Sequence, residues 1–202
     1  MIRYLADPAN AVTTAGLLFS ALGLNLALTH RPEFAVAAAL WAMLADQLDG
    51  VVAKRTPGRS AEVAVFGKAL DGFADLLYGA VFPAVVLVTT SGGSTLSFLT
   101  GTTLLVAGAI RLSYFDAFGL SKDGRFTGVP LSYDVPLLAL LFAIRPWIPG
   151  EDFGATCNLV FLTLATLHVA PLRVPAIGGA AYGVVTAYSV AASALLILKA
   201  LT

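Results

Sequence analysis

The sequence predicts an all-α membrane protein, a polytopic bundle of transmembrane helices with six core spans and a seventh at the carboxyl end. Two observations support this fold class. Apolar residues make up 58% of the 202-residue chain and charged residues only 12%, about half the charged content of a soluble domain. The apolar runs also approach or exceed the roughly 20 residues that cross a bilayer as a helix, and they lack the alternation of barrel strands.

The spans follow one another with short connections. The seven apolar runs are 10–29, 34–54, 66–90, 94–117, 130–148, 154–172 and 175–200. We expect the first run to remain as a span, because no small-residue cleavage site follows it. The connections are rich in Gly, Pro and Ser, and no internal repeat is found, so we expect residues 1–202 to form a single domain.

The basic residues predict the orientation. With the amino terminus in the cytoplasm, nine Lys and Arg residues fall on the cytoplasmic side and three on the other, which agrees with the positive-inside rule. We therefore expect an integral protein of the inner, or cytoplasmic, membrane. The single Cys157 excludes an internal disulfide. No long basic run indicates a nucleic-acid partner.

Four aspartates stand out between residues 45 and 75. Asp46 and Asp49 share one face at the end of the second span, and Asp71 and Asp75 share one face of the third. Antiparallel helices can bring all four to one point at the cytoplasmic surface. Ionised carboxylates at membrane depth repel one another and need cations. Oxygen ligands favour Mg²⁺ or Mn²⁺, and a two-metal site could clamp a pyrophosphate.

The residues around these acids complete a recognisable pattern. Their spacing resembles the signature of the CDP-alcohol phosphatidyltransferases, membrane enzymes that join a CDP-linked lipid to an alcohol. Its eight positions are occupied in order by Asp46, Asp49, Gly50, Ala53, Lys54, Gly67, Asp71 and Asp75. Two departures are Lys54, where the family has arginine, and a gap of twelve residues before Gly67, about four more than usual. We expect the extra residues to lengthen a loop over 55–66 without moving the acids.

Further segments resemble bacterial phosphatidylserine synthases. They are PANAVTTAG at 8–16, FGKALDGFADLLYGAVFP at 66–83, AIRLSYFD at 109–116 and RFTGVP at 125–130. The resemblance implies transfer of the phosphatidyl group of CDP-diacylglycerol to the hydroxyl of L-serine, giving phosphatidylserine and CMP, in a homodimer. Choline, inositol, inositol phosphate or glycerol phosphate remain alternative acceptors. An ion-coupled transporter is a remote alternative, because transporters place acids near mid-membrane.

The resemblance also implies roles for single residues. The metal ligands would be Asp46, Asp49, Asp71 and Asp75, and Asp75 would also be the catalytic base. The nucleotide would be bound by Asn10, Thr13, Asp49, Gly50, Ala53, Lys54 and Gly67.

Acceptor binding is expected on the segment that follows the fourth span. Arg111 and Arg125 could hold the carboxylate of serine, and Asp116 or Asp134 its ammonium group. Tyr114 belongs to a group of aromatic residues that could instead surround choline. His168, within an apolar run, is interpreted as a hydrogen-bonded residue of the bundle and not as a metal ligand.

Overall fold

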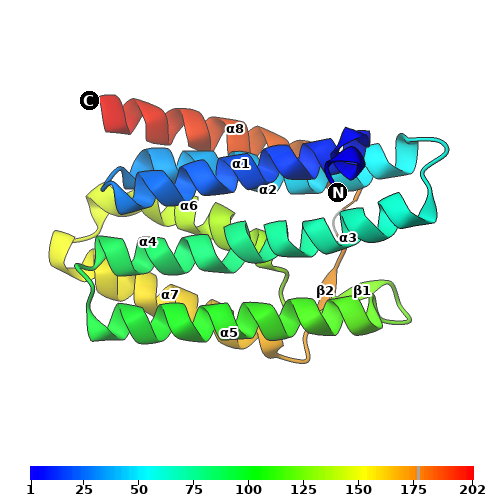
Figure 1. Cartoon of the computed structure of the whole chain (residues 1–202). Helices are drawn as coiled ribbons and strands as arrows, with labels where there is room; N and C mark the ends of the chain where they lie inside the picture. The colour runs from blue at the N-terminus through cyan, green and yellow to red at the C-terminus, as the bar shows by residue number, and fades with distance from the viewer. Residues whose placement is uncertain (177) are drawn as a thin grey trace.

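The computed structural model describes residues 1–176 and 178–202, which form a bundle of helices running along one axis (Figure 1). The elements are η1 (Ile2–Ala6), α1 (Pro8–Leu28), α2 (Pro32–Arg55), α3 (Ala61–Leu76), η2 (Leu77–Val81), α4 (Phe82–Thr90), α5 (Thr95–Phe118), β1 (Arg125–Thr127), η3 (Leu131–Tyr133), α6 (Asp134–Ile144), η4 (Arg145–Trp147), α7 (Gly150–Val169), β2 (Arg173–Pro175) and α8 (Ala180–Leu201). The predicted all-α membrane bundle is confirmed.

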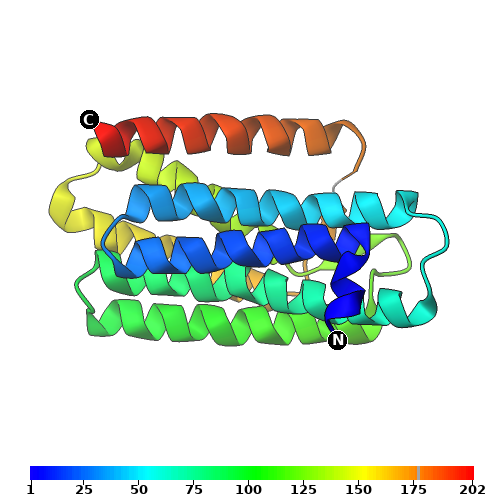
Figure 2. The ribbon, with the colours of Figure 1, turned by 45° about the horizontal axis from the view of Figure 1, so that its top comes forward.

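Helix α2 is the central element of the bundle. It packs along α1, α6 and α8, and α8 lies along one edge of the bundle (Figure 2). Small residues allow α1 and α2 to approach closely: a Cβ on Gly16 would lie 3.2 Å from the Ala45 Cβ and 3.3 Å from the Ala42 carbonyl oxygen. Close contacts of this kind drive the association of helices in membranes. They also fix the axial position of α2 and of the aspartates at its end.

The third span is one continuous rod, Ala61–Thr90, with a π-helical turn in the middle. Helix α3 begins after Ser60, whose side chain accepts a hydrogen bond from the Val63 amide. The π turn precedes Pro83, which has no N–H to donate to the Gly79 carbonyl. It directs Tyr78 into the interior, where this side chain is fully buried.

Two sequence predictions need correction. The third span begins at Ala61 and not near residue 66, so the loop covers only residues 56–60 and not 55–66. The predicted fifth span, 130–148, contains α6 of only 11 residues, about 16 Å long and too short to cross a bilayer alone. Six helices in the described part of the chain are long and apolar enough to do so, which makes the protein an integral membrane protein.

The chain still crosses the bundle an odd number of times, because the segment before α6 makes up for the short length of this helix. Residues 125–130 enter the bundle largely as extended chain, and β1 pairs with β2 in antiparallel register, with Phe126 opposite Val174. Helix α6 then completes this pass. The two termini accordingly lie at opposite ends of the bundle (Figure 1).

Candidate active site

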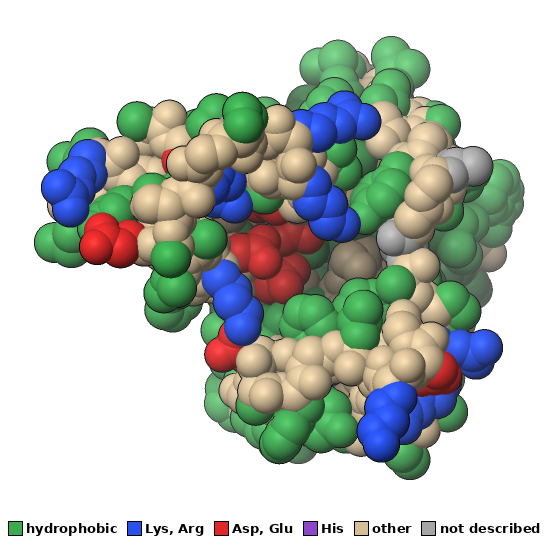
Figure 3. Space-filling model, turned by 90° about the vertical axis from the view of Figure 1, so that its right-hand side faces the viewer, with side chains coloured by type: hydrophobic (Ala, Val, Ile, Leu, Met, Phe, Trp, Pro, Cys, Tyr) green, Lys and Arg blue, Asp and Glu red, His purple; other side chains and the backbone are tan. Residues whose placement is uncertain are grey.

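Acidic side chains lie in a hollow at the end of the bundle where α2 finishes and α3 begins. Figure 3 looks onto this end and shows acidic groups inside the hollow with Lys and Arg side chains around it. Asp46 and Asp49 come from α2, and Asp71 and Asp75 from α3. Asp46 interacts electrostatically with each of the other three. The structure thus brings the four predicted carboxylates together.

Tyr78 connects the two helices through these acids. Its hydroxyl oxygen lies 2.9 Å from Asp46 Oδ2 and 2.8 Å from Asp75 Oδ1. A phenol carries one hydrogen and cannot donate it fully to two carboxylates at once. The pair therefore needs a further proton or a cation. Tyr78 was not predicted as a site residue, although its hydroxyl lies in an apolar span three residues after Asp75, on the same helix face.

Asp49 is held from the other side by α1. The Thr13 hydroxyl donates to Asp49 Oδ2, and Asp49 is buried. Three of the four carboxylates, those of Asp46, Asp49 and Asp75, thus have one oxygen within hydrogen-bond distance of a hydroxyl, and Asp46 and Asp75 share that of Tyr78. Hydroxyls in this position orient a carboxylate and leave its second oxygen for another partner.

A small cavity of about 200 Å³ opens beside Asp49, and most of the predicted nucleotide-binding residues line it. It is lined by Ala9, Asn10, Thr13, Asp49, Gly50, Ala53, Arg59, Ala64, Gly67, Lys68 and Asp71. Lys54 is exposed and does not border it. Arg59 borders it but was not among the predicted binding residues.

The two glycines of the motif, Gly67 and Gly50, have different surroundings. A Cβ on Gly67 would overlap Asn10 Oδ1 and lie 3.1 Å from Arg59 Nη2, so a side chain there would displace the ends of these two polar groups. A Cβ on Gly50 would meet no protein atom within 4 Å. Since Gly50 borders the small cavity, a side chain there would extend toward open space at the site.

A second cavity, the α3–α5 cavity, has a volume of about 480 Å³ and borders Asp71 and Asp75. Lys68 and Asp116 line it and form an exposed ion pair, with Nζ 2.7 Å from Oδ1. Phe115 also belongs to its wall. Asp71 and Lys68 border both this cavity and the small one, so the two cavities meet at the aspartates.

The other predicted acceptor residues are spread more widely. Arg111 is buried, with its guanidinium carbon 5.4 Å from the Phe115 ring centre and 5.2 Å from that of Phe126. Its Nε has no hydrogen-bond partner in the described structure, and it lies within electrostatic reach of Asp75. Arg125 is exposed and pairs with Asp123 at 3.4 Å. Tyr114 packs against Phe118, away from the aspartates, beside a separate surface cavity.

Asp134 and His168 form a second buried polar group. Their side chains are fully buried, and His168 Nε2 lies 3.2 Å from Asp134 Oδ2. His168 Nδ1 lies 2.8 Å from the Val129 carbonyl oxygen and must donate to it. His168 is thus the hydrogen-bonded bundle residue that the sequence predicted, and Asp134 borders neither the small cavity nor the α3–α5 cavity.

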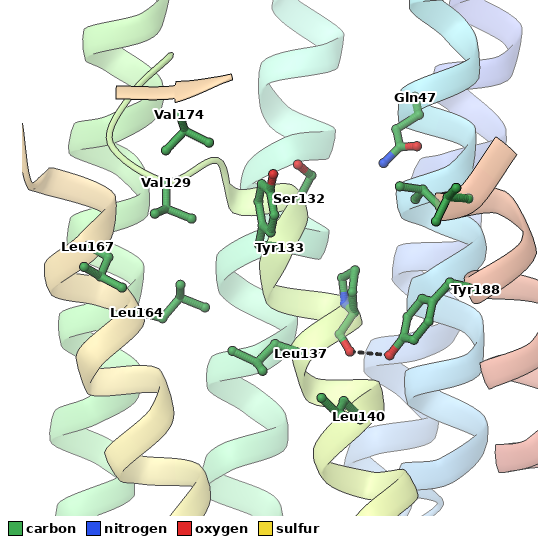
Figure 4. Close-up of a pocket in the computed structure, with 13 residues that line it drawn as sticks. Gln47, Val129, Ser132, Tyr133, Leu137, Leu140, Leu164, Leu167, Val174 and Tyr188 are labelled. Atoms are coloured by element: carbon green, nitrogen blue, oxygen red, sulfur yellow. Dashed lines mark hydrogen bonds between the residues drawn. The ribbon is translucent and has the colours of Figure 1, made fainter. Parts of the chain in front are cut away.

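A further cavity, about 600 Å³ in volume, lies between α2, α6, α7 and α8 (Figure 4). Its described lining contains no charged side chain. Tyr188 points into it from α8 and donates to the Pro136 carbonyl at 2.7 Å, and Gln47 lines it from α2. This apolar cavity is suited to hydrocarbon and not to phosphate.

The aspartates fit a hard divalent cation by their donor chemistry. Carboxylate oxygens are the ligands that Mg²⁺ and Mn²⁺ prefer, and the Asp46–Tyr78–Asp75 contact lacks positive charge. As the side chains stand, no three Asp, Glu, His or Cys residues in the described chain form a ready-made metal site. For several of these carboxylates to share one ion, their side chains would have to change conformation.

Comparison with known proteins identifies the family. No curated protein sequence matches the chain. A family profile described as CDP-alcohol phosphatidyltransferase matches residues 7–167, from the residue that caps α1 almost to the end of α7. This match covers well over half of the chain and contains all four aspartates, Tyr78 and both cavities that meet at them. The protein therefore belongs to the CDP-alcohol phosphatidyltransferase family, transferases that use a CDP-linked lipid and an alcohol acceptor.

Proposed function

We propose that the protein transfers the phosphatidyl group of CDP-diacylglycerol to the hydroxyl of L-serine. In this reaction the serine oxygen forms a bond to the lipid-side phosphorus. The bond from that phosphorus to the bridging oxygen breaks, and CMP leaves with the bridging oxygen. The proton of the serine hydroxyl passes to a carboxylate. The products are phosphatidylserine and CMP.

The meeting of two cavities at Asp71 carries this proposal. The small cavity, with Asn10 and Gly50, has room for part of a nucleotide, and the larger α3–α5 cavity offers room for an acceptor. A pyrophosphate lying beside Asp71 would then present its lipid-side phosphorus between the two. Holding both reactants at such a junction lowers the entropic barrier of a two-substrate reaction.

Asp75 is the best candidate for the base. It borders the α3–α5 cavity, and the Tyr78 hydroxyl holds one of its oxygens. Its second oxygen remains able to accept the proton of the acceptor hydroxyl. A carboxylate within hydrogen-bond reach typically contributes 10²- to 10⁴-fold to such a step.

Asp46, Asp49, Asp71 and Asp75 would hold Mg²⁺ or Mn²⁺, in keeping with the general metal dependence of the family. The bound ions would supply positive charge to offset that of the carboxylates and of the pyrophosphate. The protein's own contribution is to orient these acids through Tyr78 and Thr13. The nucleotide would be contacted from the lining of the small cavity.

Serine is the acceptor that the charges favour. It carries an ammonium and a carboxylate, and the α3–α5 cavity has both Lys68 and Asp116 on its wall. Arg111 stacks on Phe115, whose ring borders the same cavity, and has an unpaired Nε. Choline is a cation without a carboxylate, so a basic group would not bind it. Phosphorylated acceptors need several clustered basic residues.

We further propose that the site faces the cytoplasm in the inner membrane, because nine of the twelve Lys and Arg residues belong to the segments expected on that side. The family resemblance favours a homodimer, which the mass of the detergent-solubilised protein would test.

An acceptor panel tests the reaction. Purified protein is mixed with CDP-diacylglycerol, Mg²⁺ or Mn²⁺, and serine, choline, inositol, inositol phosphate or glycerol 3-phosphate, and CMP release is measured. We expect release with serine and none when the metal ion is omitted. Release with another acceptor alone would reject serine, and no release with any of them would reject this set of acceptors.

A further inference from the structure

Arg59 is one of two basic residues, with Lys68, that line the small cavity. It lies in the loop 56–60, within the interval between Lys54 and Gly67 where this chain is longer than the family pattern. Its side chain reaches across to the start of α1, 52 positions earlier in the sequence. Nε lies 3.0 Å from Asp7 Oδ2, and Nη2 lies 2.9 Å from Asp7 Oδ1. This two-pronged contact fixes the plane of the guanidinium.

Neighbouring groups hold Arg59 still more firmly. Nη2 also donates to Asn10 Oδ1 at 3.0 Å, and the absence of a side chain at Gly67 leaves space for both groups. Burial by itself would raise the pKa of Asp7, but the hydrogen bonds from Arg59 and from the Asn10 amide outweigh it and lower the pKa below its usual value. Asp7 thus stays ionised and keeps Arg59 in place at neutral pH.

The guanidinium still has unused donors. Three of its five N–H groups are taken by Asp7 and Asn10, and Nη1, which carries the other two, has no hydrogen bond to any described residue. Nη1 is not among the buried unpartnered atoms, so it has access to solvent. Since Arg59 lines the small cavity together with Asp49 and Asp71, these free donors are available to an anion bound there.

Lys54 offers a direct contrast. It occupies the position of the family arginine, yet it lies exposed in the last turn of α2 and outside the lining of the small cavity. It makes no hydrogen bond or ion pair in the described structure. A lysine also lacks the planar fork with which arginine binds two phosphate oxygens.

We infer that Arg59, oriented by Asp7 and Asn10, binds the diphosphate of the nucleotide in place of the basic residue that the family signature has at position 54. The inference rests on the proposed function, because it assumes that the small cavity receives the CDP moiety. It assigns a binding role to a residue in the interval between Lys54 and Gly67, where the chain is longer than the family pattern.

The test measures CDP binding to the detergent-solubilised protein with Mn²⁺ by calorimetry, without an acceptor. Arg59→Gln should weaken binding roughly tenfold or more, as expected for the loss of charged hydrogen bonds. Asp7→Asn should weaken it less, because Arg59 keeps its charge. Lys54→Gln should change it by less than about threefold, and Arg55→Gln, the matched control on the same segment, should leave it unchanged.

The outcomes separate this inference from the proposed function. Wild-type CDP affinity in Arg59→Gln would overturn the inference, as would equal losses in Arg59→Gln and Asp7→Asn, which would make Arg59 only a tether for the loop. Absence of CDP binding in the wild type would instead contradict the proposed function.

A second measurement requires no variant and so does not depend on how Arg59→Gln folds. Phenylglyoxal modifies accessible arginines, and peptide mass spectrometry gives the rate at Arg59. CDP with Mn²⁺ should slow modification of Arg59 and not of Arg55. Equal rates at Arg59 with and without CDP would overturn the inference.

Discussion

The bundle contains two groups of polar side chains with carboxylates, one formed by Asp134 and His168 and the other by the four aspartates around Tyr78. The two groups differ in whether the protein itself neutralises the charge of the carboxylates. His168 Nδ1 carries a hydrogen and donates it to the Val129 carbonyl. One further proton lies between His168 Nε2 and Asp134: on Nε2 it gives an ion pair, and on the carboxyl it gives a neutral pair. Both choices balance the charge within the pair, while Asp134 Oδ1 has no hydrogen-bond partner in the described structure. At Tyr78, one hydroxyl hydrogen faces both Asp46 and Asp75, and Asp49 and Asp71 lie close by.

This difference distinguishes a structural polar group from a site. A pair whose charges balance needs no cation from outside and can connect α6 to α7. An excess of carboxylates needs a partner that the chain does not provide, and it lies where two cavities meet. Burial alone would not identify the functional site, because His168 and Asp134 are even more deeply buried than Asp49.

The largest expected effect comes from removing the base within the unbalanced group. Asp75→Asn keeps the shape of the side chain but cannot accept the acceptor proton. We expect the rate of CMP release to fall roughly 10³-fold, with CDP affinity within about threefold of wild type. Steady-state kinetics and calorimetry measure the two quantities.

The control for this variant is Glu33→Gln, which removes a carboxylate that pairs with Arg145 far from the aspartates. It should retain wild-type turnover. If Asp75→Asn also turns over at the wild-type rate, Asp75 is not the base.

Removal of one partner of the Asp134–His168 pair should reduce the stability of the protein and leave the reaction unchanged. His168→Ala leaves Asp134 buried without its partner, a change that typically destabilises a protein by about 3–5 kcal/mol. We expect a lower denaturation temperature in detergent, with CMP release per folded molecule within about threefold of wild type. Replacing both residues by leucine should recover much of the lost stability, since the pair is then removed as a unit. A specific loss of turnover in well-folded His168→Ala would give this pair a role in the reaction.

The smallest effect is expected from Tyr78→Phe. The substitution removes the hydroxyl that holds Asp46 and Asp75 but leaves both acids. Without it Asp75 is less well oriented, so kcat should fall by about tenfold while KM for CDP-diacylglycerol changes little. Tyr188→Phe is the matched control, because its hydroxyl bonds only the Pro136 carbonyl in the described structure. Equal kcat in the two variants would show that Tyr78 does not orient the base.

Hydropathy predicted most of the fold, and its errors have a common cause. It measures apolar content and not helix length, so the run 130–148 was interpreted as a full span. Pro130 and the Arg145–Pro146 pair interrupt regular helix at its two ends. The true start of α3 was nonetheless present in the sequence as a capping serine, Ser60, ahead of Val63.

The site was predictable where it depends on local spacing. Helical periodicity put Asp46 with Asp49 and Asp71 with Asp75, and the structure brings the two pairs together. Tyr78 was missed although Asp75 lies three residues before it, because its role also depends on Asp46, 32 positions away. The contact of Arg59 with Asp7, 52 positions away, was likewise not predicted. No local pattern encodes the two long-range contacts.

The π turn at Leu77–Val81 has a consequence for how this protein could change in evolution. A π turn holds one residue more than the α-helical turn that it replaces, and one residue corresponds to about 100° of rotation around a helix axis. Loss of one residue from the turn would therefore restore a regular α-helical turn and leave the two halves of the rod in nearly the same relative phase. A deletion between Asp75 and the π turn that the turn did not absorb would instead rotate Asp71 and Asp75 by about 100° around the helix axis, if the α4 half kept its packing. The π turn thus absorbs a change in chain length within the rod, and we expect it to tolerate the loss of a single residue better than the regular helix next to it.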